Sequence, residues 1–446
     1  MDEFFQNEKK RVLFFFLLMP SFFVAAQTTT VKDTLLQEIT LKNAIDYAIK
    51  FQPQIQQSLI DEQITSSNIR SKLADWYPQV NFNYNLQHNF ILQSSIIGGN
   101  VVKFGVDNTS FGQFTLTQAV FNKDVLLAKR TKGDVQLQSR QTTENNKIDL
   151  VANVSKAYYD VLATRQQIKV AAENIVRIER SLQDATNQYK AGITDKIDYK
   201  RATITLNNIK ASKESNEELY KAKIEYLKSL MGYPEMAGLN IVYDSLQMEN
   251  EITFDTLQRP DYRARIEYRL LETQRKLLQS NLLYNKWSYL PSVAINGAYN
   301  LNYQNNSFTK LYVNNYPNSY AAVTLAFPIF QGGKRNANIK TAELQLQRSD
   351  QDIIRLKNTV NTQHAQALAS YKANLENYLA LKENVKLAKE VYDVIQLQYR
   401  SGIKTYLEVI TAETDLRTSQ INYFNALYQV LSSKVDLQRV LGQIVY

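Results

Sequence analysis

An internal duplication constrains this sequence more than any other feature. The segment 189–193 (YKAGI) returns as 399–403 (YRSGI), and Gly232 returns as Gly442, each time with a shift of 210 residues. A shift of this length is far beyond the roughly 20–50 residues of a solenoid repeat. The pattern therefore predicts two copies of one larger module that contains helices and a strand pair.

The N-terminal residues carry the three marks of a secretory signal peptide. Basic residues over 9–11 precede an apolar run over 12–19 and the small residues of 24–26. About 8–13 apolar residues are too few to span a bilayer, so a membrane anchor is disfavoured. We therefore expect residues 1–26 to be the signal peptide of an exported chain.

Composition excludes several classes of protein. The chain has no cysteine, which rules out disulfides, thiolate metal sites and a lipidated N-terminal cysteine. Its net charge of +9 is scattered among acidic residues, so nucleic acid is not an expected partner. His88 and His364 are the only histidines, and neither a zinc-protease motif nor a P-loop is present. We expect no enzyme activity, catalytic residue, cofactor or metal site.

Two long tracts without proline predict long helices. They run from about 122 to 190 and from about 333 to 400, and both are rich in Gln, Lys, Leu and Ala. Apolar residues recur three or four positions apart in both tracts: Val154, Ala157, Val161, Thr164, Ile168, Ala171, Ile175, Ile178, Leu182, Ala185 and Tyr189, then Tyr378, Leu381, Val385, Ala388, Tyr392, Ile395 and Tyr399. A seam with a period of about 3.5 is typical of coiled coils.

Each apolar seam ends three residues before a repeated glycine, which predicts a helix end there. A shorter helical tract follows each glycine, over 195–230 and 405–441. Each half therefore contains a helical hairpin whose turn lies at Gly192 or Gly402. The longer helix of each hairpin, with about 65 residues, would reach about 100 Å, three times the apolar thickness of a membrane.

A second periodicity, of two residues, predicts strands. Val80, Phe82, Tyr84, Leu86 and Phe90 alternate with amide residues, as do Val293, Ile295, Gly297, Tyr299, Leu301 and Tyr303 with mostly amide residues. A polar stretch follows each (93–110 and 305–318), and a strand then returns over 114–120 or 323–327. Four strands of about ten residues with one apolar and one amide face are typical of a transmembrane barrel. The alternative is a soluble sandwich with an asparagine-rich wet face.

Four strands cannot close a barrel alone, because an open edge in lipid leaves unpaired amides that cost on the order of several kcal/mol each. We therefore expect an oligomer. A dimer would give eight strands, whose interior is filled by side chains, whereas a trimer would give twelve strands around a water-filled lumen. That lumen would be lined by Asn81, Asn83, Asn296, Asn300 and Asn302. The helical hairpins of three chains would continue the wall as a tube.

Four segments resemble landmarks of the TolC-type outer-membrane efflux proteins, in the order of that family and over essentially the whole mature chain. They are the opening helix over 41–53, the segment 259–262 (RPDY), the strand-to-helix turn 327–333 (FPIFQGG) and the two Tyr-x-x-Gly turns. One departure is the segment 118–121 (QAVF), which stands where the second half has its proline-containing turn.

The resemblance implies an α+β membrane protein. Three copies of the chain would form a homotrimer with one twelve-stranded β-barrel, to which each chain contributes four strands. A long periplasmic α-helical coiled-coil barrel would continue the β-barrel. The location implied is the outer membrane of a diderm bacterium, with outer-membrane lipid around the barrel. The function implied is the exit channel of a tripartite efflux or type I secretion system, docked onto a periplasmic adaptor and an inner-membrane pump.

The duplication and the resemblance together divide the chain. Residues 27–233 are expected to form the first structural repeat, 234–258 a linker in an equatorial position, and 259–446 the second repeat. The competing functions are a general diffusion porin, which would need many more strands per chain, and a surface coiled-coil adhesin, which would lack the strands. The transported substrate is not predicted.

The resemblance also suggests a gate near the hairpin turns. Positions that match Asp198, Tyr399 and Lys404 link neighbouring hairpins in the family, and the position that matches Glu408 narrows the pore with a carboxylate ring; a second ring carboxylate falls here on Thr411. We expect Asp198 to accept hydrogen bonds, across hairpins, from Lys404 and from the Tyr399 hydroxyl. The alternatives are that both carboxylates stabilise helix N-termini and that Tyr399 only packs in its seam.

The turns themselves are the expected contacts of the adaptor. The residues concerned are Gly192, Ile193, Gly402 and Ile403. In each pair the glycine would form the turn and the isoleucine would present an apolar side chain at its tip.

Overall fold

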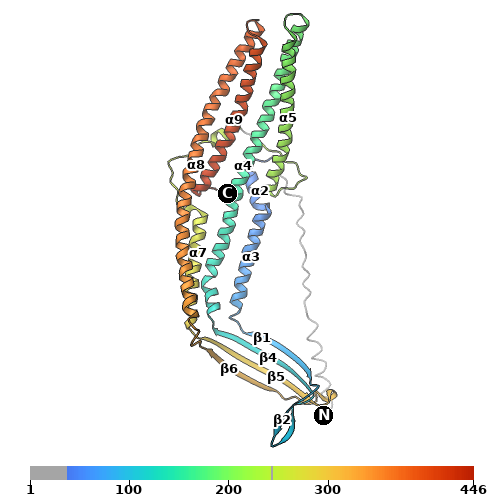
Figure 1. Ribbon diagram of the computed structural model, residues 1–446, viewed down its shortest axis with the longest axis vertical. Helices are drawn as coiled ribbons and strands as arrows, with labels where there is room; N and C mark the ends of the chain where they lie inside the picture. Colours follow the sequence, from blue (N-terminus) through green and yellow to red (C-terminus); the bar gives the residue numbers. More distant parts are fainter. Residues whose placement is uncertain (1–37, 243–244) are drawn as a thin grey trace. The chain divides into compact units, whose positions relative to one another are not determined.

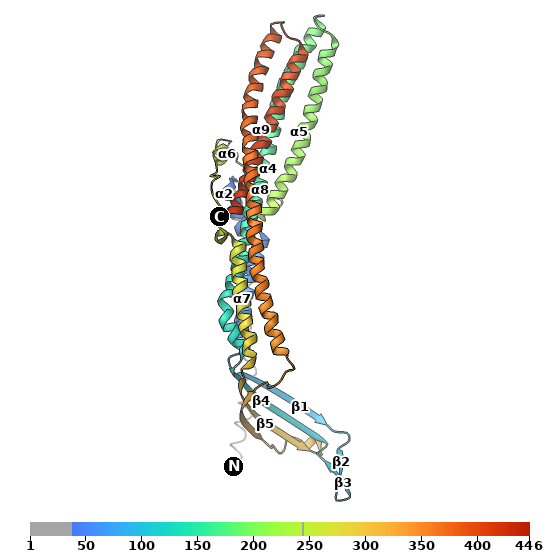
Figure 2. The same ribbon diagram turned by 60° about the vertical axis from the view of Figure 1, so that its left-hand side comes forward.

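The computed structural model describes residues 38–242 and 245–446, so the expected signal peptide (1–26) and residues 27–37 of the expected first repeat lie outside the described residues. The range expected for the first repeat contains α2 (Leu41–Phe51), α3 (Pro53–Ala74), β1 (Gln79–His88), β2 (Gln93–Ile97), β3 (Asn100–Phe104), β4 (Asn108–Phe121), α4 (Lys123–Lys190) and α5 (Lys196–Met231). The second contains α7 (Ile266–Lys286), β5 (Ser292–Asn305), β6 (Asn318–Ala326), α8 (Lys334–Arg400) and α9 (Tyr406–Leu441). The short helix α6 (Ser245–Glu251), labelled in Figure 2, lies between them in the sequence; the other helices are labelled in Figure 1.

Local sequence signals set the ends of the long helices. The Asn122 side chain accepts a hydrogen bond from the Asp124 backbone N–H at 2.7 Å and so caps the start of α4. Both α4 and α8 end before a glycine with positive φ, 74° at Gly192 and 73° at Gly402. Glycine adopts this left-handed conformation without steric strain. The two predicted helical hairpins, α4 with α5 and α8 with α9, are confirmed (Figures 1 and 2).

The predicted seams are the buried faces of the long helices. Val154, Ile178 and Ala185 of α4 are completely buried, and Tyr378 and Tyr392 of α8 are nearly so. A cluster around Ile178 joins α4 to α5, and a cluster around Tyr392 joins α8 to α9. Because α4 also packs along α9, the two hairpins of the chain lie side by side.

The opening helix is divided in two. Gln52 leaves helical geometry with ψ of 124°, because the following Pro53 disfavours the α conformation in the residue before it. The Gln52 side chain then accepts a hydrogen bond from the Ile55 backbone N–H at 3.2 Å, and Pro53 occupies the first turn of α3.

The strands form one antiparallel sheet in the order β1-β4-β5-β6. Residues opposite one another on paired strands point to the same face, and Asn83, Gln113, Asn300 and Asn318 form one such row across all four strands. The register places all five asparagines expected in the lumen on this same face: Asn81, Asn83, Asn296, Asn300 and Asn302. The outer edges of β1 and β6 have no partner strand among the described residues.

The opposite face of the sheet is apolar and uncovered in the single chain. Phe82 on β1 is 56% exposed and Val323 on β6 is 72% exposed. A soluble sandwich would bury this face beneath a second sheet. The exposure of these side chains argues against the sandwich alternative.

A second, two-stranded sheet was not predicted. The stretch 93–110, expected to be a polar connection, contains the hairpin of β2 and β3 and the first residues of β4. Gly98 and Gly99 have φ values of 59° and 85°, as the tightest hairpin turns require. Ile96, Ile97, Val101 and Val102 flank that turn, and such β-branched residues favour strands. Polar residues on both sides of this short segment obscure the strand signal.

Among the described helices none combines the length and apolar character needed to cross a bilayer.

Candidate functional site

The two hairpin turns have the same backbone geometry. The Ile193 N–H donates to the Gln188 carbonyl at 2.9 Å, and the Ile403 N–H donates to the Gln398 carbonyl at the same distance. This six-residue closure is the Schellman motif, which satisfies carbonyls at a helix C-terminus. Ile193 and Ile403 are 73% and 71% exposed, so each turn presents one apolar side chain to its surroundings.

Glu408 is held within its own chain. Its carboxylate accepts hydrogen bonds from Lys404 Nζ at 2.6 Å and from the Thr405 backbone N–H at 2.9 Å. With Thr405 it forms a capping box at the start of α9. The hydrogen bond from Lys404 is the main reason why the pKa of Glu408 is lowered to about 2. The carboxylate therefore stays charged at any physiological pH.

Asp198, the equivalent residue in the first repeat, has no such partners. The first residue before α5, Asp195, makes no side-chain cap, and Asp198 accepts no hydrogen bond from any residue in the described ranges. Burial and then the Asp198 carboxylate raise the pKa of Tyr399, so these two side chains lie within electrostatic reach. The Tyr399 hydroxyl donates to Gln188 Oε1 at 3.0 Å.

The expected latch is therefore not formed inside one chain. Lys404 is bound to Glu408 and Tyr399 is bound to Gln188. Tyr399 also packs against the buried ring of Tyr406, with the ring centres 5.8 Å apart, so it has the packing role that was its alternative. The hydrogen bonds to Asp198 stay a prediction.

Polar contacts join the two hairpins along α4 and α9. Arg439 pairs with Asp149, Lys156 with Asp436, Gln167 with Asn425 and Arg177 with Glu413. These partners are more than 230 residues apart in sequence, and the sequence analysis identified none of them. From pair to pair the residue number on α4 rises while the number on α9 falls, as in two antiparallel helices. This relation is recognisable only once α4 and α9 are known to pack together.

Segment 234–258 contacts all four hairpin helices, including α5, where Lys228 Nζ donates to the Glu235 carbonyl at 2.9 Å. The Tyr158 hydroxyl of α4 donates to the Val242 carbonyl at 2.9 Å. The Tyr371 hydroxyl of α8 donates to the Ile252 carbonyl at 2.8 Å, and the Tyr423 hydroxyl of α9 donates to Glu249 at 2.6 Å. This segment therefore ties the two hairpins together at their middle.

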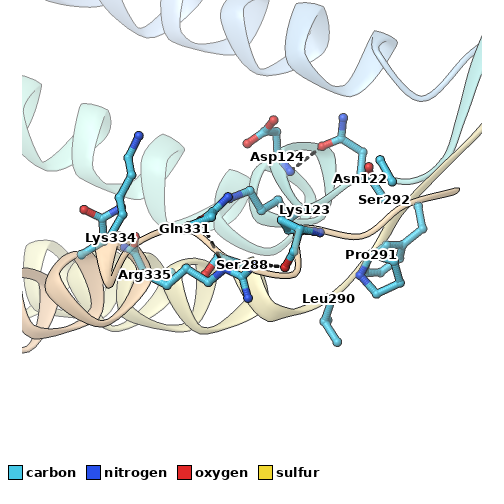
Figure 3. Close-up of a pocket in the computed structure, with 15 residues that line it drawn as sticks. Asn122, Lys123, Asp124, Ser288, Leu290, Pro291, Ser292, Gln331, Lys334 and Arg335 are labelled. Carbon is cyan, nitrogen blue, oxygen red and sulfur yellow. Dashed lines mark hydrogen bonds between the residues drawn. The ribbon is translucent and has the colours of Figure 1, made fainter.

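A cavity at the junction of the strands and helices is drawn in Figure 3. The Arg335 guanidinium donates to the Pro328 carbonyl and to Gln331 Oε1, the latter at 3.2 Å. It also lies 5.1 Å from the centre of the Tyr289 ring. These contacts fix the turn between β6 and α8.

The described ranges contain no group of three His, Cys, Asp or Glu side chains that could hold a metal ion.

The sequence matches the family model of the outer membrane efflux proteins over residues 44–233 and 270–443. It is 20% identical to the outer membrane protein TolC of Escherichia coli K12 over 427 residues, which cover 92% of this chain and 84% of TolC. It is 22% identical to the outer membrane protein OprJ of Pseudomonas aeruginosa, with 92% of this chain and 85% of OprJ covered.

Solved structures show the same fold. The crystal structure of CusC aligns with a TM-score of 0.73 at 16% identity, over 90% of this chain and 91% of CusC. The open-state channel MtrE of Neisseria gonorrhoeae aligns with a TM-score of 0.70 at 18% identity, over 90% of this chain and 88% of MtrE. The predicted resemblance, outer-membrane location and role in efflux are confirmed. The chain belongs to the outer membrane efflux protein family.

Proposed function

We propose that three copies of this chain form the exit duct of a tripartite efflux or type I secretion system. The observation that carries the proposal is the four-stranded sheet, with one apolar face, one amide face and two outer edges that pair with no other strand of the described ranges. If β6 of one chain pairs with β1 of the next, twelve strands close around a water-filled lumen. The amide rows line that lumen, the apolar face meets lipid, and the hairpins continue the wall as a periplasmic tube.

Purified protein tests this assembly and its conduction together. The protein is extracted from outer membranes in detergent, and light scattering measures the number of chains per particle. The same protein is then reconstituted in planar bilayers for conductance recordings. Three chains per particle and discrete conductance steps are expected. A monomer that stays soluble without detergent would contradict the proposal. A trimer with a wide, permanently open conductance would favour a diffusion porin.

A gate at the hairpin turns is part of the proposal. The Asp198 carboxylate accepts no hydrogen bond from the residues that the structure describes, so it is available to Lys404 or Tyr399 of an adjacent hairpin when the tube assembles. Exposed pairs contribute about 0–1 kcal/mol each, so threefold symmetry gives a latch of a few kcal/mol that an adaptor can overcome. Asp198→Ala should raise the conductance of the closed channel. An unchanged closed-state conductance would reject the latch.

The exposed isoleucines support docking of a periplasmic adaptor at the turns. A photo-crosslinking residue at Ile193 or Ile403 should capture the adaptor in cells, and mass spectrometry would identify it. The same residue at Leu387, an exposed position of α8 farther from the turn, is the control. Equal capture at all three positions would argue against docking at the turns.

An efflux role is favoured over type I secretion by the names of the relatives. Matching proteins of Pseudomonas putida include the outer membrane components of a toluene efflux pump and of an antibiotic efflux pump. We propose that the adaptor and inner-membrane pump of this chain belong to an efflux system. Sensitivity of a deletion strain to a panel of toxic solutes, with normal protein secretion, is the expected result.

A further inference from the structure

A buried polar cluster lies where the first hairpin meets the second. Glu413 on α9 is 2% exposed, and Asn174 on α4 is completely buried. Arg177 on α4 lies between them: its Nε is 3.5 Å from Glu413 Oε1, and its Nη2 donates to Asn174. The Arg177 guanidinium also lies 6.0 Å from the centre of the Tyr392 ring of α8.

The cluster leaves an unusual number of buried polar atoms without hydrogen bonds. Within the described ranges, both carboxylate oxygens of Glu413, the amide nitrogen of Asn174 and the hydroxyls of Tyr392 and Tyr406 have no hydrogen-bond partner. Buried carboxylates normally accept several hydrogen bonds, because burying a charge without them is costly. Ionisation of Glu413 would therefore place a charge where few hydrogen bonds stabilise it, and it would weaken this contact between the hairpins.

The other ion pairs between the hairpins differ from this one. In the pairs Lys156–Asp436 and Arg439–Asp149 every side chain is between 30% and 46% exposed, so water can solvate each partner. Glu413 is the one carboxylate in this series that water does not reach in the described packing. Among these three pairs it also lies nearest the hairpin turns along α4 and α9.

We propose that Glu413 and Arg177 form a proton-sensitive clasp between the two hairpins of each chain, closed while Glu413 is protonated and loosened when Glu413 ionises. The inference rests on the proposed function, in which these hairpins form the periplasmic entrance of the channel. Arg177 and Glu413 act here as positioning residues, since they set the spacing of helices that carry the turns.

The groups around Glu413 determine the direction of the effect. Arg177 of α4 and Arg417 of α9 favour the carboxylate, but burial outweighs both and raises the pKa of Glu413 to about 7. Tyr392 of α8 and Tyr406 of α9 also have raised pKa values, chiefly because they are buried, so they stay neutral in this range. Glu413 is thus the one of these groups that titrates near neutrality.

The packed contact therefore binds a proton more tightly than any arrangement in which water reaches Glu413. A solvated Glu has a pKa near 4.5. The packed arrangement is favoured most below that value; its advantage falls as pH rises from about 4.5 to about 7 and does not change further above 7. The two pKa values limit the change in the ratio of packed to loosened forms to about 300-fold.

Spin-label distances test this directly, because the chain has no cysteine of its own. Lys190→Cys and Arg400→Cys place labels on exposed residues at the ends of α4 and α8. Labelled chains are diluted with unlabelled ones in reconstituted assemblies, so that distances within one chain dominate. The distance should be short near pH 4.5 and lengthen as the pH rises towards 7, with the midpoint of the change between these two values and little further change above pH 7.

Three further variants in the labelled background separate the clasp from general effects of pH. Glu413→Gln should keep the short distance at every pH, and Arg177→Gln should move the midpoint upward, because it removes a cation that favours the carboxylate. Glu383→Gln, which changes an exposed carboxylate of α8, should behave as the parent does. A distance that ignores pH in the parent, or that follows pH equally in Glu413→Gln, would overturn the clasp. Bilayer recordings of the same preparations report separately whether the protein conducts at all.

Discussion

Replacing Phe82 by Lys should prevent assembly, whereas the same change at the neighbouring Asn83 should be tolerated. The two residues are adjacent on β1 and point to opposite faces of the sheet. Phe82 lies on the uncovered apolar face, with its ring centre 4.7 Å from that of Phe114. Asn83 lies in the amide row with Gln113 and Asn300.

The magnitude follows from the two environments. A lysine on the lipid face near the middle of a barrel costs about 2–4 kcal/mol. Loss of the aromatic pair with Phe114 adds about 0.5–1.5 kcal/mol. The expected cost of Phe82→Lys is therefore about 3–5 kcal/mol per chain, and it is incurred three times in a trimer. Asn83→Lys keeps its charge in the aqueous lumen and should cost about 1 kcal/mol or less.

The assay is the fraction of chain recovered as heat-resistant oligomer in the outer-membrane fraction. Phe82→Lys should lose at least tenfold relative to the parent, and Asn83→Lys should stay within about twofold. Asn83→Lys should also reduce cation conductance, because it adds three positive charges to the lumen. Equal yields for the two variants, or a larger loss for Asn83→Lys, would refute the assignment of faces.

Three other outcomes follow from individual contacts. Gly232→Ala should lower the thermal stability of the extracted protein more than Gly192→Ala: both glycines have positive φ, but only at Gly232 would the new Cβ meet backbone, at 2.8 Å. By NMR the Glu408 carboxylate should titrate near pH 2, and its pKa should be higher in Lys404→Met. The contribution of Glu408 to the stability of the folded chain is present above about pH 4.5 and is lost as pH falls towards 2. Tyr158→Phe, which leaves the Val242 carbonyl without its donor, should cost about 1–3 kcal/mol and increase proteolysis near residue 242; unchanged proteolysis would count against the role given to this contact.

Features with a local cause could be predicted from the sequence. The long helices, their seams and their ends at Gly192 and Gly402 follow from a period of 3.5 and from the backbone freedom of glycine. The four strands of the sheet follow from alternation, and alternation also predicts that the amides share one face. The hairpin of β2 and β3 also has a local signal, the adjacent glycines Gly98 and Gly99, although polar residues surround it.

Features that depend on packing between the repeats could not be predicted. Arg177 and Glu413 are 236 positions apart, and nothing in the local sequence distinguishes Glu413 from the many solvated acidic residues of the helices. Glu408 and Asp198 occupy equivalent positions, yet only Glu408 has a threonine at the N-cap and a lysine four residues before it. The difference between the two carboxylates therefore depends on neighbours that the duplication did not preserve.

The most direct test of the account is the symmetry of the assembled particle. Electron cryo-microscopy of the protein in lipid nanodiscs should show three chains and a closed barrel of twelve strands, with β6 of each chain beside β1 of the next and Asn300 facing the lumen. A particle with one or two chains, or a barrel with its amide rows turned towards lipid, would contradict the account.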